Sequence, residues 1–100
     1  MATIKVKIIT GAREKRRADQ TKFFQLTGVT ANSQLAFVQC NDEELITKMA
    51  RGSFIVISSC RQHVTAENII IVETQDSTKV ILHSEYRLNI FVHVRRNNKK

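Results

Sequence analysis

The sequence predicts a single, mainly β domain with one short helix. Short runs rich in Val, Ile and Phe recur along the chain, and polar segments separate them, which is the pattern of strands and turns. One segment, NDEELITKMARG, differs because acidic residues open it and a glycine closes it, as in a capped helix. A lone helix among strands does not fit the repeated strand–helix alternation of a parallel sheet.

Length and composition agree with one domain. The chain has 100 residues, of which 42% are apolar, and this is enough for one core without disulfides or a metal. We expect a folded domain over residues 1–82, a strand or helix extension over 83–94, and a basic flexible tail over 95–100.

The first strand is predicted at Thr3–Thr10, where Ile and Val alternate with Lys, as in a strand with one face in water. Gly11 ends this strand in the prediction. The segment AREKRRADQ that follows contains no strongly apolar side chain, so we expect it to form a solvated loop. Its cations are Arg13, Lys15, Arg16 and Arg17.

Two further strands are predicted before the helix, at Thr21–Val29 and Gln34–Cys40, with a turn of sequence TANS between them. Because Phe23 and Phe24 are adjacent, they point to opposite faces of their strand. Phe24 shares its face with Leu26. Phe23 therefore either packs beneath a loop or the helix, or faces a ligand.

The helix is predicted at Asp42–Arg51. Asn41 is the expected N-cap with Glu44 as its capping-box partner, and Gly52 is the expected C-cap. Three apolar side chains share one face and are expected in the core beneath the helix: Leu45, Ile46 and Met49.

The rest of the chain is predicted as strands joined by polar segments. Ser53–Cys60 is the fourth strand, Arg61–Glu67 is a loop, and Asn68–Thr74 is a fifth strand whose continuous apolar run suggests burial on both faces. The segments KVILH (79–83) and LNIFVHV (88–94) form two extra strands, a hairpin, or partly helix.

Charge is the strongest functional signal. Lys and Arg number 16 against 9 Asp and Glu, and the net charge of +7 favours a polyanionic partner. No apolar run reaches the roughly 20 residues of a membrane span, and Lys5 and Lys7 interrupt the core of any signal peptide. We therefore expect a nuclear or, alternatively, cytoplasmic protein without membrane contact, in which Cys40 and Cys60 are reduced and buried.

Nothing in the sequence assembles a catalytic or metal site. His63, His83 and His93 are scattered, without a carboxylate or cysteine at a motif spacing. A phosphate-binding loop needs glycines and a lysine at set offsets, and these do not occur. We expect a protein that is not an enzyme and that needs neither cofactor nor metal.

The order of the predicted elements, three strands, a helix and two strands, is that of an OB-fold, a five-stranded Greek-key barrel, here with extra C-terminal strands. Three stretches carry a closer resemblance: KFFQLTGV, LAFVQCNDEELITKM and RGSFIVISSCRQHV. Over Ile4–Leu82 the chain resembles the OB domains of the replication protein A large subunit, a family that binds single-stranded DNA.

The resemblance implies a binding face between the loop after the first strand and the loop before the fifth, where bases stack on rings and the backbone meets cations. Carried onto this chain, the residues of these loops are Arg13, Lys15, Arg16, Arg17, Arg61, Gln62 and His63. The family has a stacking aromatic just before an Asn-Asp pair, where this chain has Cys40. Phe23 is the candidate that replaces it.

Three function classes are consistent with these features. The leading hypothesis is a module that binds single-stranded nucleic acid, with DNA preferred over RNA. The alternative is a protein-interaction or oligomerisation module of a DNA-associated complex. The strands after Lys79 carry apolar residues, such as Ile90 and Phe91, beyond those that a small barrel needs for its core, and these could contact a partner. The third is an RNA- or ribosome-associated basic protein, for which small size and high positive charge are typical.

Overall fold

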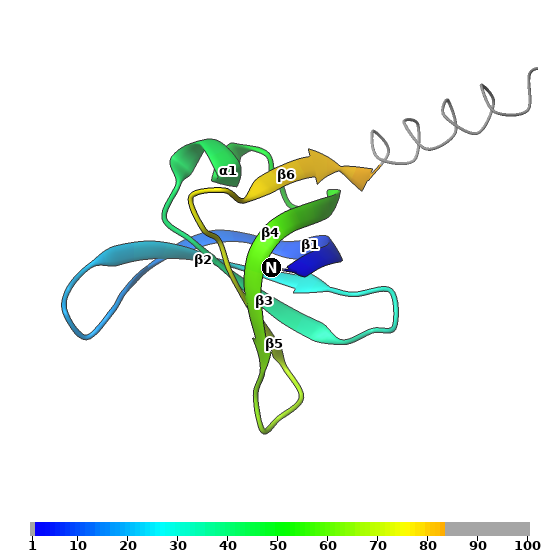
Figure 1. Cartoon of the computed structure of the whole chain (residues 1–100), viewed down its shortest axis with the longest axis horizontal. Coiled ribbons are helices and arrows are strands. Elements are labelled where there is room, and N and C mark those ends of the chain that lie inside the picture. The colour runs from blue at the N-terminus through cyan, green and yellow to red at the C-terminus, as the bar shows by residue number, and fades with distance from the viewer. Residues whose placement is uncertain (1, 84–100) are drawn as a thin grey trace, which may run out of the picture.

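The computed structural model describes residues 2–83. In chain order, its elements are β1 (Ala2–Arg16), β2 (Lys22–Val29), β3 (Leu35–Cys40), α1 (Glu43–Thr47), β4 (Phe54–Val64), β5 (Ile70–Glu73) and β6 (Lys79–Leu82) (Figure 1). The prediction of a mainly β chain with one short helix between the third and fourth strands is confirmed, and β6 is the first of the predicted extra strands. Most of the predicted strand or helix extension over 83–94, and the whole tail at 95–100, lie outside the described residues.

Five of the strands close into a ring. Antiparallel pairs join β1 to β2, β2 to β3, β5 to β4 and β4 to β1, while β3 and β5 are parallel. Each of these five strands therefore pairs with two others of the ring, and β6 pairs with β4 in addition. Figure 1 shows the β1–β2 and β4–β5 hairpins projecting away from this ring in different directions.

The long strand β4 serves two parts of the ring because it bends in its middle. Its first half pairs with β1 and β6, and its second half pairs with β5. The bend is a bulge at Ser59, which β1 skips: Thr3 lies opposite Ser58 and Ala2 lies opposite Cys60. Ser59 has a left-handed backbone, with φ of 58°, which turns the strand at this point.

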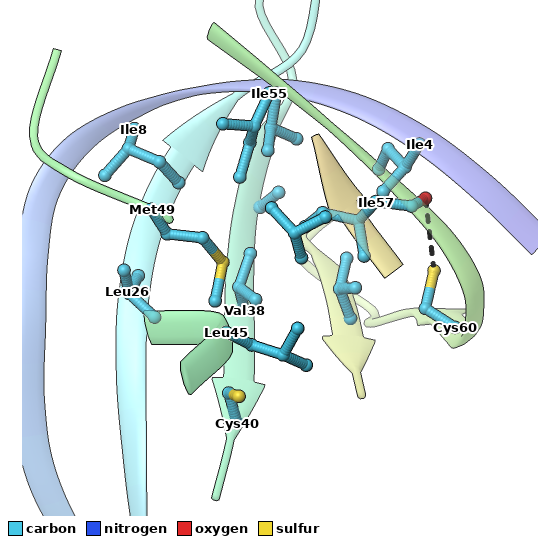
Figure 2. Close-up of a cluster of buried hydrophobic side chains, with 14 of the residues drawn as sticks. Ile4, Ile8, Leu26, Val38, Cys40, Leu45, Met49, Ile55, Ile57 and Cys60 are labelled. Atoms are coloured by element: carbon cyan, nitrogen blue, oxygen red, sulfur yellow. Dashed lines mark hydrogen bonds between the residues drawn. The ribbon is translucent and has the colours of Figure 1, made fainter. Parts of the chain in front are cut away.

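The core fills the inside of the ring. Alternate residues of the strands point inward and are fully buried, and they include Val6, Ile8, Leu26, Val38, Ile55, Ile57 and Val72. Figure 2 shows Leu45 of α1 and Met49, just after it, pointing into the same cluster. The predicted burial is therefore confirmed for Leu45 and Met49, whereas Ile46 is only half-buried and packs at the margin of this cluster.

The helix is shorter than predicted and has a different cap. It covers Glu43–Thr47, and its N-cap is Asp42, whose carboxylate accepts from the backbone N–H of Glu44 at 2.9 Å. The prediction of Asn41 as N-cap is therefore wrong. The helix ends early because β1 holds the segment after it, where the N–H of Gly52 donates to the carbonyl of Ile8 at 2.7 Å.

Two strands extend through segments that were predicted as loops. β1 passes Gly11 and continues to Arg16, paired with β2 as far as Lys22, and β4 continues through Arg61 to Val64, paired with β5. Both segments were predicted as loops because they contain few apolar side chains. A strand in a projecting hairpin does not need such side chains, because hydrogen bonds to its paired strand hold it. β5 was also predicted to be buried on both faces, whereas only alternate residues of it are buried.

Both cysteines are free and buried, as predicted. The thiol of Cys60 lies 3.4 Å from the carbonyl oxygen of Ala2, its hydrogen-bond acceptor across the β1–β4 pair. Burial raises the pKa of Cys60 above its ordinary value, so this thiol is protonated at neutral pH. A buried, protonated thiol is a poor nucleophile.

We predict that Thr78 stabilises the bend in β4. Its buried hydroxyl donates to the carbonyl of Ser59 at 2.8 Å and accepts from the N–H of Gln75 at 2.6 Å. Thr78→Val keeps the shape but leaves both backbone groups unpaired, and we expect it to lower the free energy of unfolding by about 1–3 kcal/mol.

The control is Thr78→Ser, which keeps the hydroxyl and should cost less than Thr78→Val. Urea unfolding followed by circular dichroism measures both. A Val variant as stable as the Ser variant would contradict this role.

Candidate nucleic-acid interface

Side chains on the outside of the ring line up in rows that cross five strands. One row runs from β1 through β2, β3 and β5 to β4, with each residue directly opposite the next. We call it the polar row, and its members are Arg13, Gln25, Gln39, Glu73 and Arg61. On β2, β3 and β5 the neighbours Leu26, Val38 and Val72 point inward and are buried, so the middle of the row faces outward.

A second row lies beside the first and carries an aromatic ring at its centre. We call it the Phe37 row, and its members are Thr10, Thr27, Phe37, Ile71 and His63. Phe37 is half-buried, because Thr27 and Ile71 flank it on the neighbouring strands. The two rows follow the outside of the ring from β1 round to β4, and we call this surface the outward face.

The basic segment of β1 divides between two sides of its hairpin. Two register shifts separate Ile8 from Arg13, and beyond them Arg13 lies opposite Gln25 and Lys15 opposite Phe23. Arg13 and Lys15 therefore share the side of the polar row. Arg16 lies on the other side, where its guanidinium donates to the carbonyl of Gln20 at 3.2 Å. The sequence predicted these cations as one cluster in a loop, whereas all of them except Arg17 lie on β1, on both sides of the hairpin.

Arg17 returns to the side of Lys15 by reaching over Phe23. The guanidinium carbon of Arg17 lies 4.5 Å from the centroid of the Phe23 ring. Phe23 is only 8% exposed, although it is not part of the central core cluster. Of the two roles left open for Phe23, packing beneath a loop is the one observed, and its own hairpin provides the cover.

The residues predicted on the far side of the interface lie on β4 rather than in a loop. Arg61 and His63 are exposed, and they lie opposite Glu73 and Ile71 of β5. They end the two rows that begin at Arg13 and Thr10. The two predicted groups of site residues are therefore joined through paired strands, with Arg13 on β1 and Arg61 on β4 at the two ends of the polar row.

Sequence reasoning missed Phe37 as a functional candidate. It treated LAFVQC only as a half-buried strand, and it looked for the missing aromatic at Cys40, which points inward and is 2% exposed. The signal was present in the strict alternation of this strand. Because Ala36, Val38 and Cys40 all point inward, Phe37 and Gln39 have to face outward.

Two acidic side chains, Glu73 and Asp19, lie near the proposed interface. Glu73 lies within the polar row, next to Arg61. Asp19, at the tip of the β1–β2 hairpin, has a pKa lowered from its ordinary value by the hydrogen bond from the Thr21 hydroxyl, with a smaller contribution from Arg17. Asp19 is therefore ionised at neutral pH and offsets part of the positive charge of Arg17.

Within residues 2–83, no group of three or more His, Cys, Asp or Glu side chains could hold a metal ion. No helix in the same part of the chain is long and apolar enough to cross a membrane. Comparisons with known proteins give no relative: no family model, no curated protein and no solved structure matches the chain.

Proposed function

We propose that the protein binds single-stranded nucleic acid across the outward face of an OB-fold barrel. The closed ring of five strands, with a helix between the third and fourth, supports this assignment. OB-folds bind oligonucleotides on the face of strands 2 and 3, between the loops that join strands 1 to 2 and 4 to 5. Preference for DNA rests on the resemblance to replication protein A alone.

The single observation that carries the proposal is the arrangement of the two rows. Cations stand at both ends of the outward face, namely Arg13 and Lys15 on β1 and Arg61 on β4. Between them lie the ring of Phe37, on which a base can stack, and the amides of Gln25 and Gln39. Five strands about 4.8 Å apart give a path of about 19 Å, which is long enough for several nucleotides.

Salt dependence tests the electrostatic part of this proposal. If Arg13, Lys15, Arg17 and Arg61 each neutralise a phosphate, log affinity for oligothymidine falls with log salt at a slope of about −3, using ~0.7 per phosphate. Arg13→Ala with Lys15→Ala should flatten the slope by about 1.4. Fluorescence anisotropy at several salt concentrations measures both values.

The control removes the same charge elsewhere, as Lys48→Ala with Arg51→Ala beside α1. Its slope should stay close to that of the unaltered protein. Equal slopes for the two double variants would contradict the proposed path of the backbone. Stronger competition from duplex or structured RNA than from single-stranded DNA would instead favour the RNA-associated function.

A second candidate function, self-association, is favoured by a different observation. β6 pairs with β4 alone among the described strands, and its side chains Ile81 and Leu82 are 36% and 41% exposed. They line a groove of about 500 Å³ that continues to Lys48 after α1. An apolar strand edge of this kind can pair with the same edge of a second copy. Ile90 and Phe91, on which the sequence-based prediction rested, lie outside the described residues.

Sedimentation velocity at several concentrations tests self-association. We expect a dimer that dissociates on dilution, and we expect Ile81→Ser with Leu82→Ser to remain monomeric, since it removes the apolar contact. Val64→Ser is the control, because Val64 is 58% exposed but lies on the β4–β5 hairpin. A monomer at all concentrations would exclude this function.

A further inference from the structure

We propose that Arg17 forms a nucleobase-stacking subsite, in which Phe23 supports the guanidinium from below and an unpaired base stacks on it from above. This inference rests on the proposed function and names a residue of the same interface. It gives the aromatic at Phe23 a different task from the one that the resemblance implied. The ring orients an arginine and does not itself touch the base.

The burial of the two side chains determines which one a ligand meets. Phe23 is 8% exposed, whereas Arg17, whose guanidinium carbon lies 4.5 Å from the centre of that ring, is exposed. A base that approaches the hairpin therefore meets the guanidinium first. Phe23 lies opposite Lys15, so the subsite is on the side of the polar row.

The backbone that carries Arg17 is held in place by the tip of the hairpin. Its N–H donates to the carbonyl of Thr21 at 2.9 Å, and its own carbonyl accepts from the N–H of Gln20 at 2.9 Å. Asp19 fixes the same turn, because its carboxylate accepts from the N–H of Thr21 at 3.0 Å and from the hydroxyl of Thr21 at 2.6 Å. An arginine held in this way loses less conformational freedom when it binds a ligand.

The chemistry of the guanidinium suits an unpaired nucleobase. It is planar and delocalised, it stacks on an aromatic ring with one face, and it can stack on a base with the other. Its N–H groups lie in the plane and stay free of the stack, so they can donate to a phosphate of the same strand. A duplex keeps its base faces covered, and the subsite therefore selects single strands.

The test separates stacking from charge by comparing two ligands at one salt concentration. Oligothymidine offers bases and phosphates, and an abasic oligonucleotide of the same length offers phosphates alone. Arg17→Lys keeps the charge but has no plane to stack. We expect it to weaken binding of oligothymidine by at least about fivefold and binding of the abasic strand by less than about twofold.

Two further variants complete the experiment. Arg16→Lys is the matched control, because it makes the same change on the other side of the hairpin, and it should leave both affinities within about twofold. Phe23→Leu removes the aromatic support and keeps an apolar filler, and it should reproduce the pattern of Arg17→Lys. Circular dichroism verifies that each variant keeps the β fold.

The outcomes distinguish this inference from the function on which it rests. If Arg17→Lys weakens both ligands equally, or neither, there is no stacking subsite at Arg17, while binding across the outward face stands. If Phe23→Leu binds oligothymidine as the unaltered protein does, Phe23 does not position the arginine and the inference is also wrong. If the unaltered protein binds neither ligand, the proposed function itself fails.

Discussion

The bend of β4 at Ser59 is the constraint on which the rest of the structure depends. A straight strand could not pair with β1 and β6 in one half and with β5 in the other. The left-handed backbone of Ser59 turns the strand, and the buried hydroxyl of Thr78 satisfies the carbonyl that the bulge releases from the ladder. Without this turn the ring does not close, and the rows on its outside lose their last member.

Closure of the ring makes the two faces of every strand different in kind. Inward side chains build one apolar cluster, to which Leu45 of α1 and Met49 also belong. Outward side chains build a surface with cations on β1 and β4 and an aromatic ring on β3 between them. The same alternation that stabilises the domain thus also assembles the proposed interface.

The sequence predicted the strands well wherever apolar alternation marks them, as in Thr3–Thr10 and Gln34–Cys40. The prediction failed where backbone pairing, and not a buried apolar face, holds a strand. Neither the basic segment up to Arg16 nor the second half of β4 shows the alternation of apolar and polar residues that indicates a strand. The candidate cations were found from charge. Their division between two sides follows from the extension of β1 to Arg16, because successive residues of a strand point to opposite sides, and the sequence predicted a loop there. Phe37 was missed because only the inward-facing residues of its strand were considered, and Phe37 faces outward.

The most direct test of the account is a titration of isotope-labelled protein with oligothymidine, followed by the chemical shifts of its backbone amides in NMR spectra. We predict the largest changes along the two rows, at Gln25, Phe37 and Arg61 and at Arg17 in the hairpin tip, with small changes in α1 and β6. Changes confined to α1 and β6, or to residues after His83, would contradict it, because the nucleic acid would then bind away from the outward face of the ring.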